Sequence, residues 1–229
     1  MNFIVIEGLD GAGKTTQINL LQDYLKSHHT SYKYLHFPRT EAPFYGDLIA
    51  RFLRGEFGDI RSVDPYLVAL IYGGDRMDAS EMIRSWLERD YLVIADRYVD
   101  SNIAFQCAKL DQEQDREQLR QWILSFEYEY NKIPRPDLCL FLDVPFRFTE
   151  EKLTKKRTGN DRHYLNGKQD IHERDLPFQE KVRRIYLSEV QKNPDFYAIE
   201  CGSEESYILP PDEIFEKILR LFRNRHIID

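Results

Sequence analysis

The chain has 229 residues, of which 42% are hydrophobic and 31% are charged, a length and balance typical of one globular domain with a full apolar core. Its formal net charge of -7 provides no basic field for phosphate neutralisation, so we expect no nucleic acid as a partner. The first residues read as an apolar strand, and no run of about 18 apolar residues occurs, so we expect no membrane association.

The cysteines indicate the compartment. Cys107, Cys139 and Cys201 are odd in number, far apart and free of any Cys/His cluster, so they are interpreted as small buried thiols in a reducing environment. Together with the absence of a leader-like segment, they predict a cytoplasmic location.

The first element in the chain is an apolar strand followed by a glycine-rich loop, FIVIEGLDGAGKTT at Phe3–Thr16. Residues 8–15 fit the phosphate-loop pattern G-x-x-x-x-G-K-[ST]. Glycines let successive N–H groups turn onto phosphate oxygens, and the helix predicted from Lys14 to His28 adds its positive dipole end. A chance match is disfavoured because the loop lies between a strand and an amphipathic helix. We expect the phosphates of a bound nucleotide at Gly8, Leu9, Asp10, Gly11, Ala12, Gly13, Lys14, Thr15 and Thr16, and the family resemblance described below implies that this nucleotide is ATP.

The rest of the chain alternates apolar strands with helices. Further strands are predicted at residues 34–39, 91–96, 137–143 and 196–201. Helices are predicted at 44–53, from Pro65 with Asp64 as N-cap to about Arg89, and at 99–110, 114–130, 146–156, 176–190 and 211–221. This alternation predicts an α/β fold with a five-stranded parallel sheet flanked by helices.

One long polar stretch interrupts this pattern at Lys155–Asp170. It has no apolar periodicity, and a connection of this length in a compact domain is usually functional. We therefore predict a single domain over residues 1–229, with a mobile lid at about 155–170.

Charged residues follow two predicted strands. Arg39 ends the second, and Asp96 followed at once by Arg97 ends the third. The chain lacks the Asn-Lys-x-Asp of switch GTPases, and the third strand lacks the paired acids typical of motor ATPases. An acid followed by a cation suits Mg²⁺ beside a second anionic phosphate, so Thr15 and Asp96 are the predicted metal ligands.

At this point the sequence resembles the thymidylate kinases. The matching pieces, spread over most of the chain, are GLDGAGKTTQ at 8–17, FPR at 37–39, LIYGGDR at 70–76, DRYVDSNIAFQ at 96–106 and the DR at 161–162. The resemblance implies a P-loop nucleoside monophosphate kinase that transfers the γ-phosphoryl group of ATP to dTMP, giving dTDP for dTTP biosynthesis. It also implies Mg²⁺ and a homodimer.

The resemblance also implies roles for individual residues. Asp10 matches an acid near the acceptor's sugar and phosphate, and Arg39 and Arg97 match two arginines that hold the acceptor phosphate, a dianion that guanidinium groups bind bidentately. The positions matching base and sugar contacts are Phe37, Tyr72, Arg76, Ser101, Asn102, Phe105 and Gln106. The expected catalytic residues are Asp10, Lys14, Arg97 and Arg162.

The lid is the part in which the sequence departs from the family pattern. Some members carry a catalytic arginine in the phosphate loop, where this chain has Gly11, and others supply it from the lid. The resemblance points to Arg162, with Arg157 and Lys156 next. The family commonly continues its DR with an aromatic residue and a glutamate, whereas this chain reads His163-Tyr164; Glu173 is a candidate for the missing acid.

Other hypotheses about the function remain open. A deoxynucleoside kinase needs a base beside a 5′-hydroxyl, and here Pro38-Arg39 occupies that position. A regulator that hydrolyses ATP to switch partners shares the phosphate loop. Each residue assignment also has a purely structural alternative. Asp10 could serve the turn of the loop, the two arginines could form surface ion pairs, and the base-contacting positions could belong to the core side of a helix.

Overall fold

The computed structural model describes residues 2–154, 160–165, 170–173, 175–203 and 207–228. Five strands form one sheet in the order β2-β3-β1-β4-β5, and every neighbouring pair is parallel. The strands are β1 (Phe3–Gly8), β2 (Tyr32–His36), β3 (Leu92–Asp96), β4 (Leu138–Asp143) and β5 (Phe196–Glu200). The predicted five-stranded parallel sheet is confirmed.

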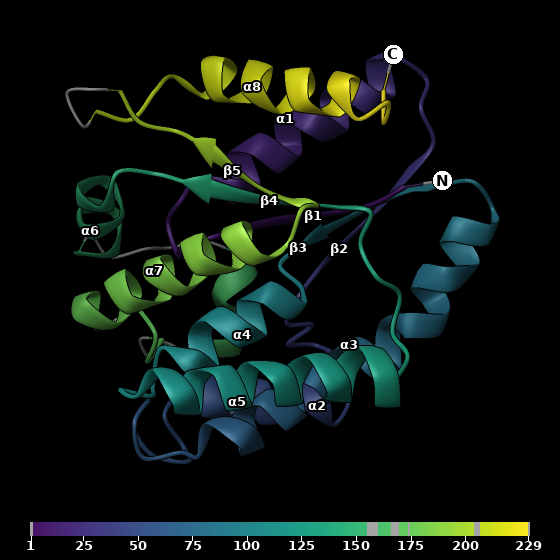
Figure 1. Cartoon of the computed structure of the whole chain (residues 1–229). Helices are drawn as coiled ribbons and strands as arrows, with labels where there is room; N and C mark the ends of the chain where they lie inside the picture. Colours follow the sequence, from purple (N-terminus) through teal and green to yellow (C-terminus); the bar gives the residue numbers. More distant parts are fainter. Residues whose placement is uncertain (1, 155–159, 166–169, 174, 204–206, 229) are drawn as a thin grey trace.

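Helices cover both faces of this sheet (Figure 1). One face carries α1 (Lys14–Ser27) and α8 (Pro211–Asn224), and the other carries α3 (Pro65–Glu88), α4 (Val99–Cys107) and α7 (Leu176–Lys192), with α5 (Glu113–Leu124) packed on α4. The remaining helices are α2 (Tyr45–Leu53), which packs on α3, and α6 (Phe146–Thr154), which follows β4. Two irregular helices complete the described part, the π-helical η1 (Ser125–Tyr130) and the 3₁₀ helix η2 (Asn160–Leu165).

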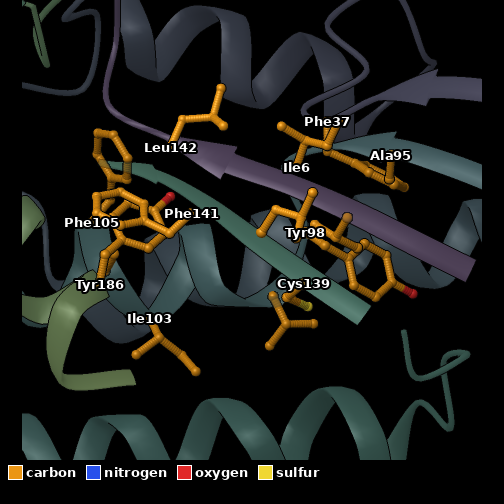
Figure 2. Close-up of a cluster of buried hydrophobic side chains, with 14 of the residues drawn as sticks. Ile6, Phe37, Ala95, Tyr98, Ile103, Phe105, Cys139, Phe141, Leu142 and Tyr186 are labelled. Atoms are coloured by element: carbon orange, nitrogen blue, oxygen red, sulfur yellow. The ribbon is translucent and has the colours of Figure 1, made fainter. Parts of the chain in front are cut away.

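Covering on both faces explains why the central strands are apolar runs without alternation. Every residue of β1 and β3 is buried. Figure 2 shows part of this core, in which Ile6, Ala95 and Cys139 of the strands meet side chains of the helical layer. Phe141 of β4 stacks on Tyr186 of α7 with ring centroids 4.7 Å apart. Because β1 is central and the chain order reverses beside it, the carboxyl end of β1 is the expected ligand crevice.

Local sequence signals explain several element boundaries. The Asp64 side chain accepts hydrogen bonds from the N–H groups of Tyr66 and Leu67, so the predicted N-cap of α3 is confirmed. β2 runs from Tyr32 to His36, so it starts two residues earlier than predicted and ends just before Pro38, which has no N–H for a further ladder bond and was the expected stop.

The predicted helix at 114–130 is in fact two segments. It is α-helical only to Leu124, and the π-helical turn that follows points Glu127 into the protein interior, where its side chain is fully buried. Part of the stretch predicted to lack periodic structure forms η2.

Gly46 allows α2 to lie directly against the loop that follows β2. A Cβ at Gly46 would lie 2.3 Å from the backbone oxygen of Arg39 and 3.0 Å from the carbonyl carbon of Thr40. Backbone atoms cannot rotate away as a side chain can, so α2 would have to move.

We therefore expect Gly46→Ala to lower the free energy of unfolding by about 1–3 kcal/mol, although alanine is the better helix former. Urea denaturation measures this. Asp47→Ala, at the exposed neighbouring position, is the control and should cost less than about 1 kcal/mol. Equal stability of Gly46→Ala and the parent chain would contradict the close packing.

Candidate active site

A cavity of about 870 Å³ opens at the carboxyl ends of β1 and β3. The phosphate loop, the ends of β2 and β3, helices α3 and α4, and the segments on either side of the lid all contribute to its wall. Of the predicted site residues, those that line it are Asp10, Gly11, Ala12, Gly13, Lys14, Thr15, Arg39, Tyr72, Asp96, Arg97, Ser101, Asn102, Phe105 and Gln106. Gly8, Leu9 and Thr16 belong to the loop without lining the cavity.

The phosphate loop has the backbone that its glycines permit. Gly11 and Gly13 have φ of 78° and 81°, and Gly13 immediately precedes α1. The Lys14 ammonium donates to the carbonyl oxygens of Gly8 at 3.3 Å and Leu9 at 3.1 Å. Burial and then the Arg97 charge lower the pKa of Lys14 to about 8, against the opposing effect of Asp96. A phosphate group would supply the negative charge that this ammonium favours.

Helix α6 packs directly on the loop at Gly11. A Cβ built there would lie 3.0 Å from the Cβ of Lys152, and the positive φ would be strained for any other residue. A longer side chain at this loop position is thus disfavoured. Lys152 itself lines the cavity. Lys152 was not among the predicted site residues, although its place one turn before the predicted lid was a signal for it.

Arg97 lies where the phosphate loop meets the end of β3. Its guanidinium donates to the Asp10 carboxylate at 2.8 Å, to Ser101 Oγ at 3.2 Å and to the Tyr186 hydroxyl at 3.4 Å. Its φ of 69° is in the left-handed region, which is uncommon for a non-glycine residue and is found at sites where surrounding contacts fix the backbone. The ion pair with Asp10 therefore connects the loop to the end of β3.

The fully buried carboxylate of Glu7 lies behind Arg97 and accepts hydrogen bonds from several of its neighbours. Glu7 accepts from the backbone N–H groups of Tyr98 at 2.8 Å and Ser101 at 3.2 Å, from Ser101 Oγ, and from the Tyr186 hydroxyl at 2.8 Å. Two of these partners in turn accept from Arg97, so Glu7 fixes the start of α4 and the arginine together. This role of Glu7 could not be predicted from the sequence, because its partners are far away in the chain.

Arg39 lies on the opposite wall and is held by α3. Its Nε donates to Asp75 at 2.8 Å, its backbone N–H donates to the same carboxylate at 2.9 Å, and its NH2 donates to Asp78 at 2.6 Å. The two predicted phosphate-binding arginines thus face one cavity, although Arg39 is engaged by carboxylates in this conformation.

Two predicted contact residues lie elsewhere. Arg76 is 1% exposed and does not line the cavity, because its guanidinium forms a buried, two-pronged ion pair with Glu127. Phe37 is also 1% exposed and packs against the ring of Tyr98, with centroids 5.5 Å apart. The structure therefore does not support direct contact of either residue with an acceptor.

The Phe105 ring is fixed by groups on several sides. The Arg97 guanidinium lies 5.1 Å from its centroid, and the His172 ring lies 4.9 Å away. Burial, followed by the Lys109 charge, lowers the pKa of His172 to about 3, so the imidazole is neutral at physiological pH.

His172 belongs to a cavity-lining segment, 170–173, that follows the lid. The Ile171 N–H donates to Leu53 O at 3.1 Å, and Gln179 Nε2 connects His172 O to Asp10. Asp170 accepts from the Tyr164 hydroxyl, and burial, followed by Asp10 and Glu173, raises its pKa to about 7. Glu173, the candidate for the missing lid acid, lines the cavity, as do Asp170 and His172, which were not among the predicted site residues. The Arg162 side chain, and Lys156 and Arg157, lie outside the described residues.

The predicted metal position fits a magnesium ion bound jointly with phosphates. Asp96 Oδ1 is buried with no hydrogen-bond partner among the described residues, while Oδ2 lies 3.2 Å from the His36 ring. Burial opposes ionisation of Asp96, but Lys14, His36 and Arg97 together lower its pKa. Thr15 is exposed on the same cavity. In the described part of the chain, no cluster of three or more His, Cys, Asp or Glu residues could hold a metal alone.

The cavity lies at the carboxyl edge of a five-stranded parallel sheet. Within it, a glycine loop at the start of a helix faces two arginines. Together these features define a P-loop nucleoside monophosphate kinase. The thymidylate kinase family model matches residues 6–207. The chain belongs to the thymidylate kinase family, whose members convert dTMP to dTDP, and the predicted resemblance is confirmed.

Individual relatives agree with this assignment. The chain is 31% identical to thymidylate kinase of Mycobacterium tuberculosis over 183 residues, covering 80% of this chain and 83% of that protein. It is 30% identical to the Desulfovibrio desulfuricans enzyme over 215 residues, covering 93% and 90%. The solved thymidylate kinase of Candida albicans superimposes with a TM-score of 0.72 at 26% identity, covering 98% of this chain and 92% of that one.

The Glu7 network gives a direct test of how Arg97 is held. Tyr186→Phe removes a hydroxyl that bonds Glu7, Ser101 and Arg97, so we expect the KM for the nucleotide acceptor to rise about three- to tenfold, with a loss of about 1 kcal/mol in unfolding free energy. Tyr197→Phe is the matched control, because among the described residues the Tyr197 hydroxyl accepts a surface bond from Arg225 alone. An unchanged acceptor KM in Tyr186→Phe would show that Arg97 does not depend on this hydroxyl.

Proposed function

We propose that this chain transfers the γ-phosphoryl group of ATP to dTMP with the residues of the cavity described above. The loop from Asp10 to Thr15 receives the ATP phosphates, and Arg39 and Arg97 receive the acceptor phosphate. One observation carries this proposal: the Asp10–Arg97 ion pair joins the donor loop to the acceptor wall inside a single cavity. Transfer between two phosphates needs both pockets within reach of one moving group.

The chemistry requires positioning more than proton transfer. The acceptor phosphate is already an anion, so no general base is needed, and charge on the transferred group is stabilised by cations and N–H groups. We expect Lys14 to bind the outer phosphates of ATP. A magnesium ion held by Thr15 and Asp96 would bridge phosphate oxygens and neutralise charge there. Asp10 accepts from Arg97 and Gln179, and so orients the acceptor side of the loop.

The other cavity-lining residues contact the base and the sugar of the acceptor. We propose that Tyr72 stacks on the base, that Asn102 and Gln106 meet its polar edge, and that Phe105 lies against the sugar and disfavours a 2′-hydroxyl. Ser101 supports Arg97 from behind. The rings and amides that form these walls are cavity-lining residues, which supports the assignment.

Further parts of the proposal concern the assembly. We propose a single kinase domain over residues 1–229 whose lid, at about 155–170, closes to bring Arg162 to the transferred group. We also propose a homodimer, supported by the exposed apolar side chains of Leu67, Leu70, Met77 and Met82 on α3. Three free, buried cysteines support a reducing, cytoplasmic setting. Among the described helices, none is both long and apolar enough to cross a bilayer.

The acceptor assay tests the function directly. With ATP and Mg²⁺, we expect dTMP to be phosphorylated to the diphosphate and thymidine not to be phosphorylated at all, because Pro38-Arg39 occupies the position after β2 where a deoxynucleoside kinase needs its base. Phosphorylation of thymidine in place of dTMP would identify a deoxynucleoside kinase. ATP hydrolysis indifferent to every nucleotide acceptor would identify the ATP-hydrolysing regulator.

Two substitutions separate binding from turnover. Arg97→Ala should raise the KM for dTMP about tenfold or more, because it removes a charged partner of the acceptor phosphate. Arg162→Ala should lower kcat about a hundredfold with little change in that KM, because a lid cation acts on the transition state. Steady-state kinetics measure both effects. If both variants lose turnover equally, and Arg97→Ala keeps its affinity for dTMP, this division of roles is wrong.

A further inference from the structure

The end of β2 places a histidine beside Asp96, one of the two predicted metal ligands. In the parallel pair of β2 and β3, His36 is the register partner of Asp96, so the two side chains leave the sheet on the same face. The Phe37 N–H donates to Asp96 O at 2.9 Å, which fixes the register at this point. Leu35 points to the other face and is buried there, whereas His36 lines the cavity.

His36 contacts one oxygen of the Asp96 carboxylate. The Nδ1 atom of the imidazole lies 3.2 Å from Asp96 Oδ2. Burial raises the pKa of Asp96, but the charge of Lys14 and the hydrogen bond with His36 outweigh it and keep that pKa below its usual value. The carboxylate is therefore ionised and can only accept, so Nδ1 carries the hydrogen of this bond, in a neutral imidazole as well as in a charged one.

His36 is the group that fixes the rotation of this carboxylate. Among the described residues, no other side chain lies within hydrogen-bond distance of its oxygens. Lys14 and Arg97 act on Asp96 through their charge. Their own hydrogen bonds go elsewhere, because Lys14 donates to carbonyl oxygens of the phosphate loop and Arg97 donates to Asp10.

The second oxygen of the carboxylate is left for a ligand. Asp96 Oδ1 is buried and has no hydrogen-bond partner in the described part of the chain. A buried acceptor without a partner is costly, and a cation or its bound water supplies what the oxygen lacks. Mg²⁺ is usually held by only one or two protein groups together with water and phosphates, so the orientation of a single carboxylate matters.

We propose that His36 is a positioning residue, which holds the Asp96 carboxylate in the orientation that keeps Oδ1 available to a magnesium ion. This inference rests on the proposed function, in that it assumes a complex of ATP and Mg²⁺ in the cavity. Carboxylates that bind metals are commonly fixed by a hydrogen bond from a further residue, and loss of that residue typically weakens metal binding about 10- to 100-fold. The imidazole itself does not touch the ion.

The test is the factor by which Mg²⁺ raises the affinity of the chain for a non-hydrolysable ATP analogue. Calorimetric titrations with excess EDTA and with Mg²⁺ give the two Kd values whose ratio is this factor. In His36→Ala we expect the factor to fall about tenfold or more, with the Kd in EDTA unchanged. The substitution should not disturb the fold, because the His36 side chain is 49% exposed and leaves no void in the core.

Two further variants show that the effect belongs to the hydrogen bond. His36→Asn should keep most of the factor, because its Nδ2 occupies nearly the place of the imidazole Nδ1 and can donate to Asp96. His28→Ala is the matched control and should keep the whole factor, since His28 is an exposed histidine just after α1 that does not line the cavity.

The outcomes separate this inference from the proposed function. An unchanged factor in His36→Ala overturns the inference. A factor that His36→Asn fails to restore also overturns it, because the imidazole would then act as a ligand of the ion and not through Asp96. If Mg²⁺ does not raise the affinity of the parent chain, the inference fails together with the metal site. A parent chain that shows the Mg²⁺ effect but does not phosphorylate dTMP overturns the proposed function alone.

Discussion

The site depends on the ion pair between Asp10 and Arg97, 2.8 Å apart, which joins the end of β1 to the end of β3. Arg97 is almost fully buried and has a left-handed backbone, a conformation that costs about 1–3 kcal/mol and persists only where neighbouring contacts require it. Those contacts are Asp10, Ser101 and Tyr186. In the proposed reaction, the same residue would bind the acceptor phosphate while its ion pair keeps it beside the phosphate loop.

Two buried carboxylates stand behind this site and act through other residues. Glu7 collects four donors at the start of α4 and so holds the partners of Arg97. Glu127 pairs with Arg76 and fixes the amide of Asn102. Neither touches the cavity, and both are fully buried. In a buried environment such satisfied polar networks specify geometry, because any reorientation would leave a polar group without a partner.

Local patterns were enough to predict the sheet, most helix starts and the donor loop. Apolar runs such as that of β1 report burial on both faces, and the loop motif is contiguous, so both can be read from neighbouring residues. The partners of Arg76 and Glu7 could not be read in this way. Glu127 lies 51 positions from Arg76 and points inwards only because of a π-helical turn, and Tyr186 lies 179 positions from Glu7. The inward packing of His172 likewise depends on contacts with α2 and α4.

A crystal structure with dTMP and a non-hydrolysable ATP analogue tests the central claim most directly. The account expects oxygens of the acceptor phosphate about 3 Å from the guanidinium nitrogens of both Arg97 and Arg39, with the ATP phosphates along the loop from Asp10 to Thr15. An acceptor phosphate bound away from Arg97, with that guanidinium still paired only to Asp10, would contradict it.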